Sequence, residues 1–414
     1  MMLAPQQLET LREAVGGDGL IEDERLEVDG VAPTLRLCPA NGEALSKLLA
    51  ALERGGLAVL VRGGGNRLAV GNPPSPVAAV LSTERLVGID EFDSSEGVCH
   101  VRSGTRLSEL REHVAASGWE LPLDPPGANT TVGGCIAAAA LGPRALGFGT
   151  PRDIVLGLEV VLASGQRTRC GGRVVKNVTG YDLNKLYTGS FGSLGVIEAA
   201  WLRLRPKPDR VVCCRKGQLD AASASRLGIE AARRISSRAS AIRSHGAGGW
   251  SLVAELAGDS LGVGRDLDEL QAMGIEEAPE AEIERIRDRQ DEASAMPSLR
   301  FRIGALPSKL ENALLELRGL GASLLAYPGL RLLYASLPLP EQPSTQAFDD
   351  AFFTVAKIAR AAGGSYVCEA APIGAKAGRD MFGDCATVVP IIRALKQGFD
   401  PAGVLNPGRL AGGV

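Results

Sequence analysis

Three consecutive glycines directly after a short apolar stretch limit what this chain can fold into more than any other feature. The apolar residues 57–61 predict a short strand, and residues 62–66 then read Arg-Gly-Gly-Gly-Asn. Glycine adopts positive φ without steric cost, so successive backbone N–H groups can turn toward one point and form an anion-binding nest. Arg62 and Arg67 add positive charge at both sides of this loop. The stretch therefore predicts a diphosphate-binding loop, and a tight glycine turn without a ligand is the alternative.

Two further glycine-rich segments indicate the same kind of ligand. Residues 125–134 read Pro-Pro-Gly-Ala-Asn-Thr-Thr-Val-Gly-Gly and run into an alanine-rich stretch. In this segment Thr131 can cap a short helix, while Gly133 and Gly134 allow a ligand to approach the positive N-terminus of that helix. Residues 189–197 read Gly-Ser-Phe-Gly-Ser-Leu-Gly-Val-Ile and lead into a strand. The three turns together predict a large ligand that contains a diphosphate.

The standard nucleotide motifs do not occur, but the order of the glycine segments is distinctive. There is no Gly-Lys dipeptide, which excludes a P-loop, and no Gly-x-Gly-x-x-Gly follows a strand, so a Rossmann dinucleotide site has no support. The order instead resembles the FAD-binding module of the vanillyl-alcohol oxidase and p-cresol methylhydroxylase (PCMH) family. The resemblance covers residues 33–207. It returns at 400–409, where Asp-Pro-Ala-Gly-Val-Leu-Asn-Pro-Gly-Arg is similar to the family's C-terminal signature.

One stretch narrows the resemblance within that family. Residues 172–197 contain Lys-Asn-Val-Thr-Gly-Tyr-Asp-Leu at positions 176–183. This stretch is similar to the FAD-binding small subunit of bacterial glycolate oxidase (glycolate dehydrogenase) complexes. The resemblance implies FAD as the cofactor, and it implies a catalytic flavoprotein subunit and an iron–sulfur subunit as partners.

The predicted cofactor site combines the glycine segments with positions that the resemblance adds. The backbone amides of residues 63–66, Gly133 and Gly134 are expected to hold the diphosphate. By resemblance, the backbone at residues 196–197 reads the adenine edge, and Gly149 and Asp153 lie along the cofactor, with local capping as the alternative for Asp153. The predicted cofactor-binding residues are Arg62, Gly63, Gly64, Gly65, Asn66, Arg67, Pro126, Thr130, Thr131, Gly133, Gly134, Gly149, Asp153, Gly195, Val196 and Ile197.

Retention of FAD is expected to be non-covalent. Some members of the family attach the flavin through a histidine in the first glycine loop or a cysteine in the second. Residues 62–72 contain no histidine. Cys135 follows the second glycine segment, and we interpret it as a buried helical cysteine rather than a tether.

The predicted fold class is α+β, with four parts along the chain. Residues 1–32 form an N-terminal helix (5–15) and a lead-in. Residues 33–207 form a PCMH-type FAD-binding domain of two α/β subdomains. In this domain, Asn41 caps a helix with apolar residues 45, 48, 49 and 52, and a hairpin joins 154–163 to 166–170. Pro206-Lys207-Pro208 marks the boundary to a smaller α+β domain, 208–346, with helices 219–236, 266–273 and 280–292 and strands 250–256 and 330–337. Residues 347–414 form C-terminal helices, the first at 347–362, and a tail that returns to the flavin domain.

Composition excludes several classes of function. The chain has 414 residues with 45 Lys and Arg against 48 Asp and Glu, so no basic surface for nucleic acid is expected. Apolar runs fall short of the roughly 20 residues of a membrane helix, and the first residues do not form a secretory signal. The 8 cysteines form no Cys-x-x-Cys pair, so neither a metal site nor an iron–sulfur cluster is predicted. We expect a cytoplasmic protein, with partners as a route to the inner face of the membrane.

The sequence offers little for substrate oxidation. A flavoenzyme that oxidises a 2-hydroxy acid needs a base for the hydroxyl proton and a cation for the carboxylate. The three histidines, His100, His113 and His245, show no ligand spacing. The remaining weak candidates for groups near the flavin are Lys176, Tyr181, Asn406 and Arg409, with Glu369 and Arg379 as further pocket residues.

Three functional hypotheses remain open. The first is a subunit that holds FAD and relays electrons between the two partner subunits. The second is a self-sufficient FAD-dependent oxidoreductase of the same family that acts on a hydroxy acid, sugar or alcohol. The third is a scaffold with a degenerate FAD module, which the complete set of glycines disfavours.

Overall fold

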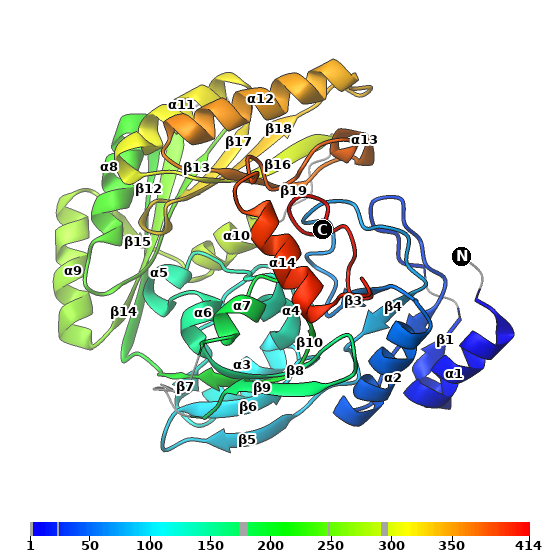
Figure 1. Cartoon of the computed structure of the whole chain (residues 1–414). Coiled ribbons are helices and arrows are strands. Elements are labelled where there is room, and N and C mark those ends of the chain that lie inside the picture. The colour runs from blue at the N-terminus through cyan, green and yellow to red at the C-terminus, as the bar shows by residue number, and fades with distance from the viewer. Residues whose placement is uncertain (1–2, 23–24, 174–180, 247–248, 291–296) are drawn as a thin grey trace.

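The computed structural model describes residues 3–22, 25–173, 181–246, 249–290 and 297–414. Three larger sheets organise this chain (Figure 1). The first sheet has the order β1-β2-β4-β3, in which β2, β4 and β3 are parallel and β1 is antiparallel to β2. Its strands are β1 (Leu20–Ile21), β2 (Arg36–Leu37), β3 (Val59–Arg62) and β4 (Ala79–Ser82).

Helices α1 (Pro5–Val15) and α2 (Gly42–Arg54) pack together beside this sheet (Figure 1). Asn41 caps α2, because its side-chain oxygen accepts a hydrogen bond of 2.9 Å from the N–H of Ala44. The predicted leucine stripe is buried, with exposed fractions of 0% at residues 45, 48, 49 and 52. The predicted helix and its core face are therefore confirmed, and β3 delivers the glycine loop at one end of this layer.

The second sheet is antiparallel, with the order β5-β6-β10-β8-β9. Its strands are β5 (Ile89–Asp93), β6 (Val98–Arg102), β8 (Val155–Val161), β9 (Arg167–Gly171) and β10 (Val196–Arg203). The helices that follow β6 are α3 (Leu107–Ala115), α4 (Val132–Ala137), α5 (Ala145–Phe148), α6 (Pro151–Ile154) and α7 (Asn184–Tyr187). The predicted hairpin is confirmed as β8–β9, with its turn at Gly165, where φ is +83°. A two-stranded sheet joins β7 (Trp119–Glu120) to β11 (Arg205–Pro206).

The third sheet has eight strands in the order β15-β12-β14-β13-β17-β18-β16-β19. They are β12 (Arg210–Leu219), β13 (Ser237–Ser244), β14 (Trp250–Gly258), β15 (Glu276–Ala278), β16 (Ser298–Gly304), β17 (Ser323–Tyr327), β18 (Leu332–Pro338) and β19 (Tyr366–Ala370). Helices α8 (Ala221–Ala232), α9 (Ser260–Ala272), α11 (Leu310–Gly319) and α12 (Thr345–Ala361) supply the largest core on one face, and α10 (Ala281–Arg289) lies on the other (Figure 1).

This sheet differs from the predicted division of the chain at its C-terminal end. Helix α12 and strand β19 belong to the eight-stranded layer, although residues 347–414 were expected to pack as a unit on the flavin domain. The reason is that α12 buries Phe348, Phe352 and Val355 against the sheet. The return toward the first two sheets begins later, with α13 (Ile373–Lys376) and α14 (Val389–Phe399) (Figure 1).

The closing segment of the chain lies against β3. The N–H of Val59 donates to the carbonyl of Val404 (2.8 Å), and the N–H of Asn406 donates to the carbonyl of Val59 (3.0 Å). Residue 405 thus forms a parallel bridge beside the strand that carries the glycine loop. Among the described residues, no helix is both long and apolar enough to cross a bilayer.

Candidate cofactor site

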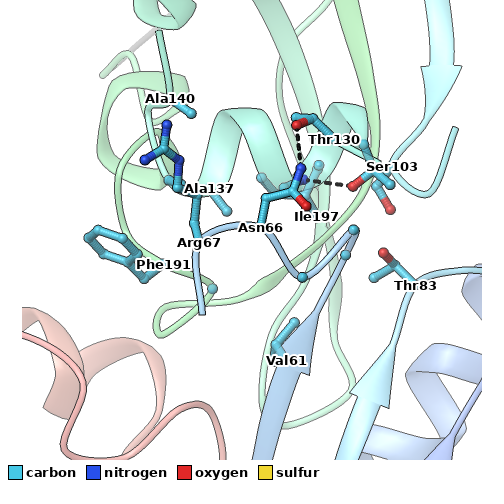
Figure 2. Close-up of a pocket in the computed structure, with 18 of the residues that line it drawn as sticks. Val61, Asn66, Arg67, Thr83, Ser103, Thr130, Ala137, Ala140, Phe191 and Ile197 are labelled. Carbon is cyan, nitrogen blue, oxygen red and sulfur yellow. Dashed lines mark hydrogen bonds between the residues drawn. The ribbon is translucent and has the colours of Figure 1, made fainter. Parts of the chain in front are cut away.

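A cavity lies where the three glycine segments meet (Figure 2). It brings together eleven of the predicted cofactor residues, from positions that lie more than 130 residues apart. These residues are Gly63, Gly64, Gly65, Asn66, Arg67, Thr130, Thr131, Gly133, Gly134, Val196 and Ile197.

The first glycine loop requires its glycines because it lies directly against the second segment. A Cβ atom at Gly64 would lie 1.8 Å from the carbonyl oxygen of Asn129, and one at Gly63 would lie 2.5 Å from Oγ1 of Thr131. Gly65 has the positive φ, +85°. Close backbone approach at two positions and positive φ at the third therefore explain the triplet.

The amides of this loop are the exposed donors of the cavity. Within the part of the chain that the structure describes, no group accepts a hydrogen bond from the backbone N–H groups of residues 63–66. Four consecutive donors at one end of a cavity can form a nest for an anion.

The amides of the second segment differ from the prediction. The N–H of Gly133 donates to the carbonyl of Ser103 (2.8 Å), and the N–H of Gly134 donates to the hydroxyl of Thr131 (3.2 Å). Helix α4 therefore begins with its first donors already engaged inside the protein. Its glycines shape the wall instead, since a Cβ at Gly133 would lie 2.6 Å from that of Ser103.

A hydroxyl locks the first loop to the second segment (Figure 2). Oγ1 of Thr130 accepts a hydrogen bond of 2.7 Å from Nδ2 of Asn66 and lies 2.7 Å and 3.0 Å from the carbonyl oxygens of Gly127 and Pro126. Pro126 thus supports the site through its carbonyl and does not line the cavity.

The two predicted arginines have different roles. Arg62 turns away to Glu84, with 3.6 Å between Nη2 and Oε2, and lines a neighbouring groove. Among the described residues that line the cavity, Arg67 is the one with a charged side chain. Its Nη1 lies 3.7 Å from Oε2 of Glu369 on β19, whose other oxygen accepts a hydrogen bond of 2.8 Å from Arg302. A buried carboxylate of the large sheet therefore holds the cavity's cation in place.

Three more predicted residues lie outside the cavity. Asp153 accepts hydrogen bonds from the N–H (2.8 Å) and hydroxyl (2.7 Å) of Thr150, which lower the pKa of the Asp153 carboxyl, so this side chain caps α6. Gly149 lies next to this cap, and a Cβ there would lie 3.1 Å from that of Asp153. Gly195 allows β10 to pack on β8, since its Cβ would lie 2.5 Å from Cγ1 of Val160.

Several residues that line the cavity are not among the predicted cofactor-binding residues. They are Val61, Leu68, Thr83, Ser103, Ala137, Ala138, Ala140, Phe191 and Gly192. Ser103 is fully buried, and its hydroxyl has no hydrogen-bond partner among the described residues. Figure 2 shows Ser103 and Thr83 on the opposite side of the glycine loop from Phe191. Ser103 directly follows β6, and nothing in its sequence context marks it as a residue of the site.

The weak catalytic candidates do not converge on the cavity. Lys176 lies outside the described residues. Tyr181 is on the surface, with an exposed fraction of 96%. Asn406 is buried, with its side chain bound to backbone groups at Val61 and Phe191. Arg409 is also buried, and it donates to the carbonyl oxygens of residues 68, 70 and 72.

The remaining polar candidates are also engaged elsewhere. His100 lies 3.1 Å from Asp90 on the second sheet, and Nε2 of His245 lies 2.8 Å from Oγ of Ser251. His113 packs edge-on against Phe92, with 5.6 Å between ring centroids. Arg379 pairs with Asp349 at 2.5 Å. No histidine of the chain lines the cavity.

Cys135 lies behind the cavity wall. Its thiol is buried and lies 3.4 Å from the carbonyl oxygen of Ala140. Burial raises the pKa of this thiol to about 12. A protonated, buried thiol is a poor nucleophile, which agrees with the interpretation of Cys135 as a core residue.

A protein-family model matches the region that contains most of this cavity. Residues 33–171 match the family model described as FAD binding domain. This region is an FAD-binding domain. The residues of the cavity fit this cofactor: four unused amides and Arg67 suit a diphosphate, an unpartnered hydroxyl faces the cavity, and small side chains leave room for flat rings.

Curated relatives share this half of the chain. D-lactate dehydrogenase of Archaeoglobus fulgidus is 40% identical over 169 residues, 41% of this chain and 38% of that protein. Glycolate oxidase subunit GlcD of Bacillus subtilis is 34% identical over 206 residues (49% of this chain, 44% of that protein). Glycolate oxidase subunit GlcE of Escherichia coli is 34% identical over 160 residues (38% and 45%). The FAD-binding domain of this chain thus spans less than half the length of the relatives it matches.

Solved structures show that the fold extends over the whole chain. The structure of p-cresol methylhydroxylase with substrate bound has a TM-score of 0.72 at 16% identity and covers 98% of this chain and 96% of its own. Alkyldihydroxyacetonephosphate synthase has a TM-score of 0.71 at 15% identity, covering 99% and 86%. The predicted PCMH-type fold is therefore confirmed.

Proposed function

We propose that this chain is an FAD-dependent oxidoreductase component that serves the oxidation of a 2-hydroxy acid such as glycolate or lactate. The relatives that share its FAD-binding domain carry the names of lactate, glycolate and 2-hydroxyglutarate enzymes. More specifically, we propose that the chain is the FAD-binding subunit of a glycolate dehydrogenase (oxidase) complex. In it, the chain holds FAD non-covalently and passes electrons between a catalytic flavoprotein subunit and an iron–sulfur subunit.

The observation that carries the relay proposal is the composition of the cavity wall. Among the residues that the structure describes, the wall contains one charged side chain, Arg67, together with the amide of Asn66, glycines, alanines, small hydroxyls and apolar residues. Proton abstraction from a hydroxy acid needs a positioned base. All three histidines lie elsewhere and have partners of their own. A cavity of this kind suits the binding of a cofactor better than acid–base chemistry.

When bound, FAD supplies the redox chemistry, and the chain's residues hold it in position. The amides of residues 63–66 and the guanidinium of Arg67 would bind the diphosphate, with about 1.5–3 kcal/mol for each charge-assisted hydrogen bond. The hydroxyl of Ser103 would add a further donor. The backbone at Val196 and Ile197, which lines the same cavity, would contact the adenine edge.

A self-sufficient oxidoreductase is the second candidate, because D-lactate dehydrogenase and the D-2-hydroxyglutarate dehydrogenases also share the domain. Reduction of the purified chain distinguishes the two. We expect bound FAD whose visible absorbance glycolate and D-lactate leave unchanged, and which bleaches when the partner subunits are added. Rapid bleaching of the chain alone would overturn the relay proposal in favour of the self-sufficient enzyme. Purification without added FAD, followed by identification of co-purifying chains, tests the proposed partners.

A further inference from the structure

One side chain from the C-terminal segment joins two walls of the cofactor cavity. Oδ1 of Asn406 accepts a hydrogen bond of 2.7 Å from the N–H of Val61, and its Nδ2 donates to the carbonyl of Phe191 at 2.6 Å. Val61 and Phe191 both line the cavity. They come from different sheets, since Val61 belongs to β3 of the first sheet and Phe191 lies in the turn before β10 of the second.

The two walls approach each other closely at this point. Gly192 has φ of +71°, and a Cβ there would lie 3.2 Å from Nδ2 of Asn406 and 3.4 Å from Cβ of Val61. Asn406 itself has φ of +46° and an exposed fraction of 3%. Asparagine is one of the few residues that adopt this backbone conformation at modest cost. The bridge thus depends on an amide that donates and accepts at once.

A buried ion pair fixes the backbone that presents Asn406. Nζ of Lys396 donates to Asp400 (2.7 Å), to the carbonyl of Leu405 (2.5 Å) and to the carbonyl of Ser193 in the same turn as Phe191. Asp400 in turn accepts hydrogen bonds from the N–H groups of Val404 (2.9 Å) and Leu405 (2.8 Å). The segment from α14 to Asn406 is therefore held to the second sheet independently of the amide.

We infer that Asn406 is a positioning residue that keeps the two cavity walls at the spacing needed to retain FAD. It does not line the cavity, so it acts through Val61 and Phe191. The inference rests on FAD occupying this cavity and not on the identity of any substrate. Loss of the bridge lets the walls separate, and a cofactor held between them then leaves faster.

The test compares FAD release from Asn406→Asp and from a matched control, Asn184→Asp. Asn184 is also buried, with an exposed fraction of 6%, and also bridges two segments: Nδ2 donates to the carbonyl of Leu156 (3.1 Å) and Oδ1 accepts from the thiol of Cys170 (3.0 Å). It does not line the cavity. In each variant a carboxylate replaces the donor and faces a carbonyl oxygen, so the chemical change is the same.

We expect both variants to lower the urea midpoint of the FAD-free chain, and only Asn406→Asp to accelerate FAD release. The acceleration is about tenfold, which corresponds to the loss of about 1.4 kcal/mol. Release is followed as the rise of flavin fluorescence after dilution, without substrate. Equal release from Asn406→Asp and wild type, or equal acceleration by Asn184→Asp, would overturn the inference. Wild-type protein that binds no FAD would overturn the cavity assignment itself.

A second pair of variants covers the case in which Asn406→Asp does not fold. Gly192 lines the cavity, but the methyl group of Gly192→Ala points between Asn406 and Val61, whereas that of Gly189→Ala meets only Cβ of Ala139, at 3.4 Å. Both positions have positive φ, +71° and +88°, so the backbone strain is similar. Faster FAD release from Gly192→Ala than from Gly189→Ala is expected, and equal rates would contradict the inference.

Discussion

The guanidinium of Arg409 lies 3.2 Å from the carboxylate of Asp29, so the last residues of the chain are tied to a segment near its beginning. Lys376 reaches the same carboxylate oxygen at 2.8 Å. Both cations also donate to carbonyl oxygens of the stretch 68–72, directly after the glycine loop. Residues distant in sequence thus anchor the exit of the cofactor loop, and this network gives the first of four predictions.

Arg409→Met should lower the free energy of unfolding by about 3 kcal/mol, because it leaves buried carbonyl oxygens without donors and removes one of the two ion pairs of Asp29. Urea denaturation of the FAD-free chain measures this effect. Arg169→Met is the control, since Arg169 is 77% exposed in its pair with Glu159 and should cost less than about 1 kcal/mol. Equal losses in the two variants would show that the buried network contributes little.

Gly64→Ala should weaken FAD binding by about tenfold or more, because overpacking of a well-packed site costs about 1–3 kcal/mol. The added Cβ would lie 1.8 Å from the carbonyl oxygen of Asn129 and push the two glycine segments apart. Gly398→Ala in α14 is the control, since a Cβ there meets no atom within 4 Å. Flavin absorbance per chain after gel filtration measures retention. Wild-type occupancy in Gly64→Ala would place the diphosphate elsewhere.

FAD should leave the denatured chain completely, because Cys135 is unsuited to covalent attachment. The pKa of the Cys135 thiol in the folded chain, about 12, lies above the ordinary value of 9.0. The thiol therefore stays protonated at neutral pH. Cys135→Ala should therefore retain FAD like the wild type. Acid precipitation measures the result, with flavin in the supernatant as the expected outcome. Flavin that remains with the precipitated wild-type chain, and is released from Cys135→Ala, would contradict this prediction.

Stability at acid pH should depend on Glu255, a fully buried carboxylate on β14. Burial raises the pKa of Glu255, but hydrogen bonds from Arg144 (2.9 Å) and Arg238 (2.6 Å) outweigh it and leave the folded pKa below 4.5. A depressed carboxyl pKa stabilises the folded state above the unfolded value, and this contribution is lost as pH falls through the folded pKa.

Urea midpoints of wild type and Glu255→Gln between pH 3 and 6 test this dependence. The wild-type midpoint should fall steeply below about pH 4.3, the ordinary glutamate pKa, while the variant should start lower and fall less. Glu43→Gln is the control, because Glu43 forms an exposed i,i+4 pair with Lys47. Parallel curves for wild type and Glu255→Gln would show that other carboxylates control acid unfolding.

The arrangement around Glu255 also explains how the large sheet is joined to the flavin domain. Arg144 precedes α5 in the FAD-binding half and lies 3.4 Å from Asp124, while Arg238 on β13 pairs with Glu120 at 3.1 Å. Carboxylates and arginines thus alternate across the contact between the two parts. Removal of one partner from such a buried ion pair is costly, because the other charge is then left buried without its counter-charge.

The sequence by itself determined the structural features that depend on residues close together in the chain. Three glycines after an apolar strand indicate a loop whose backbone lies so close to another segment that a Cβ atom would not fit. The structure has such contacts at Gly63 and Gly64. The cap at Asn41 and the leucine stripe behind it defined α2 in the same way, since capping and helical periodicity involve only neighbouring residues.

Only the tertiary structure decided which of these groups share a site. Local sequence does not distinguish Arg62 from Arg67, yet Glu84 draws one away while Glu369, some 300 residues later in the chain, holds the other at the cavity. The engaged amides of Gly133 and Gly134, the unpartnered hydroxyl of Ser103 and the bridge through Asn406 all depend on how separate sheets meet. Such contacts follow from long-range packing, which local propensity and residue spacing do not encode.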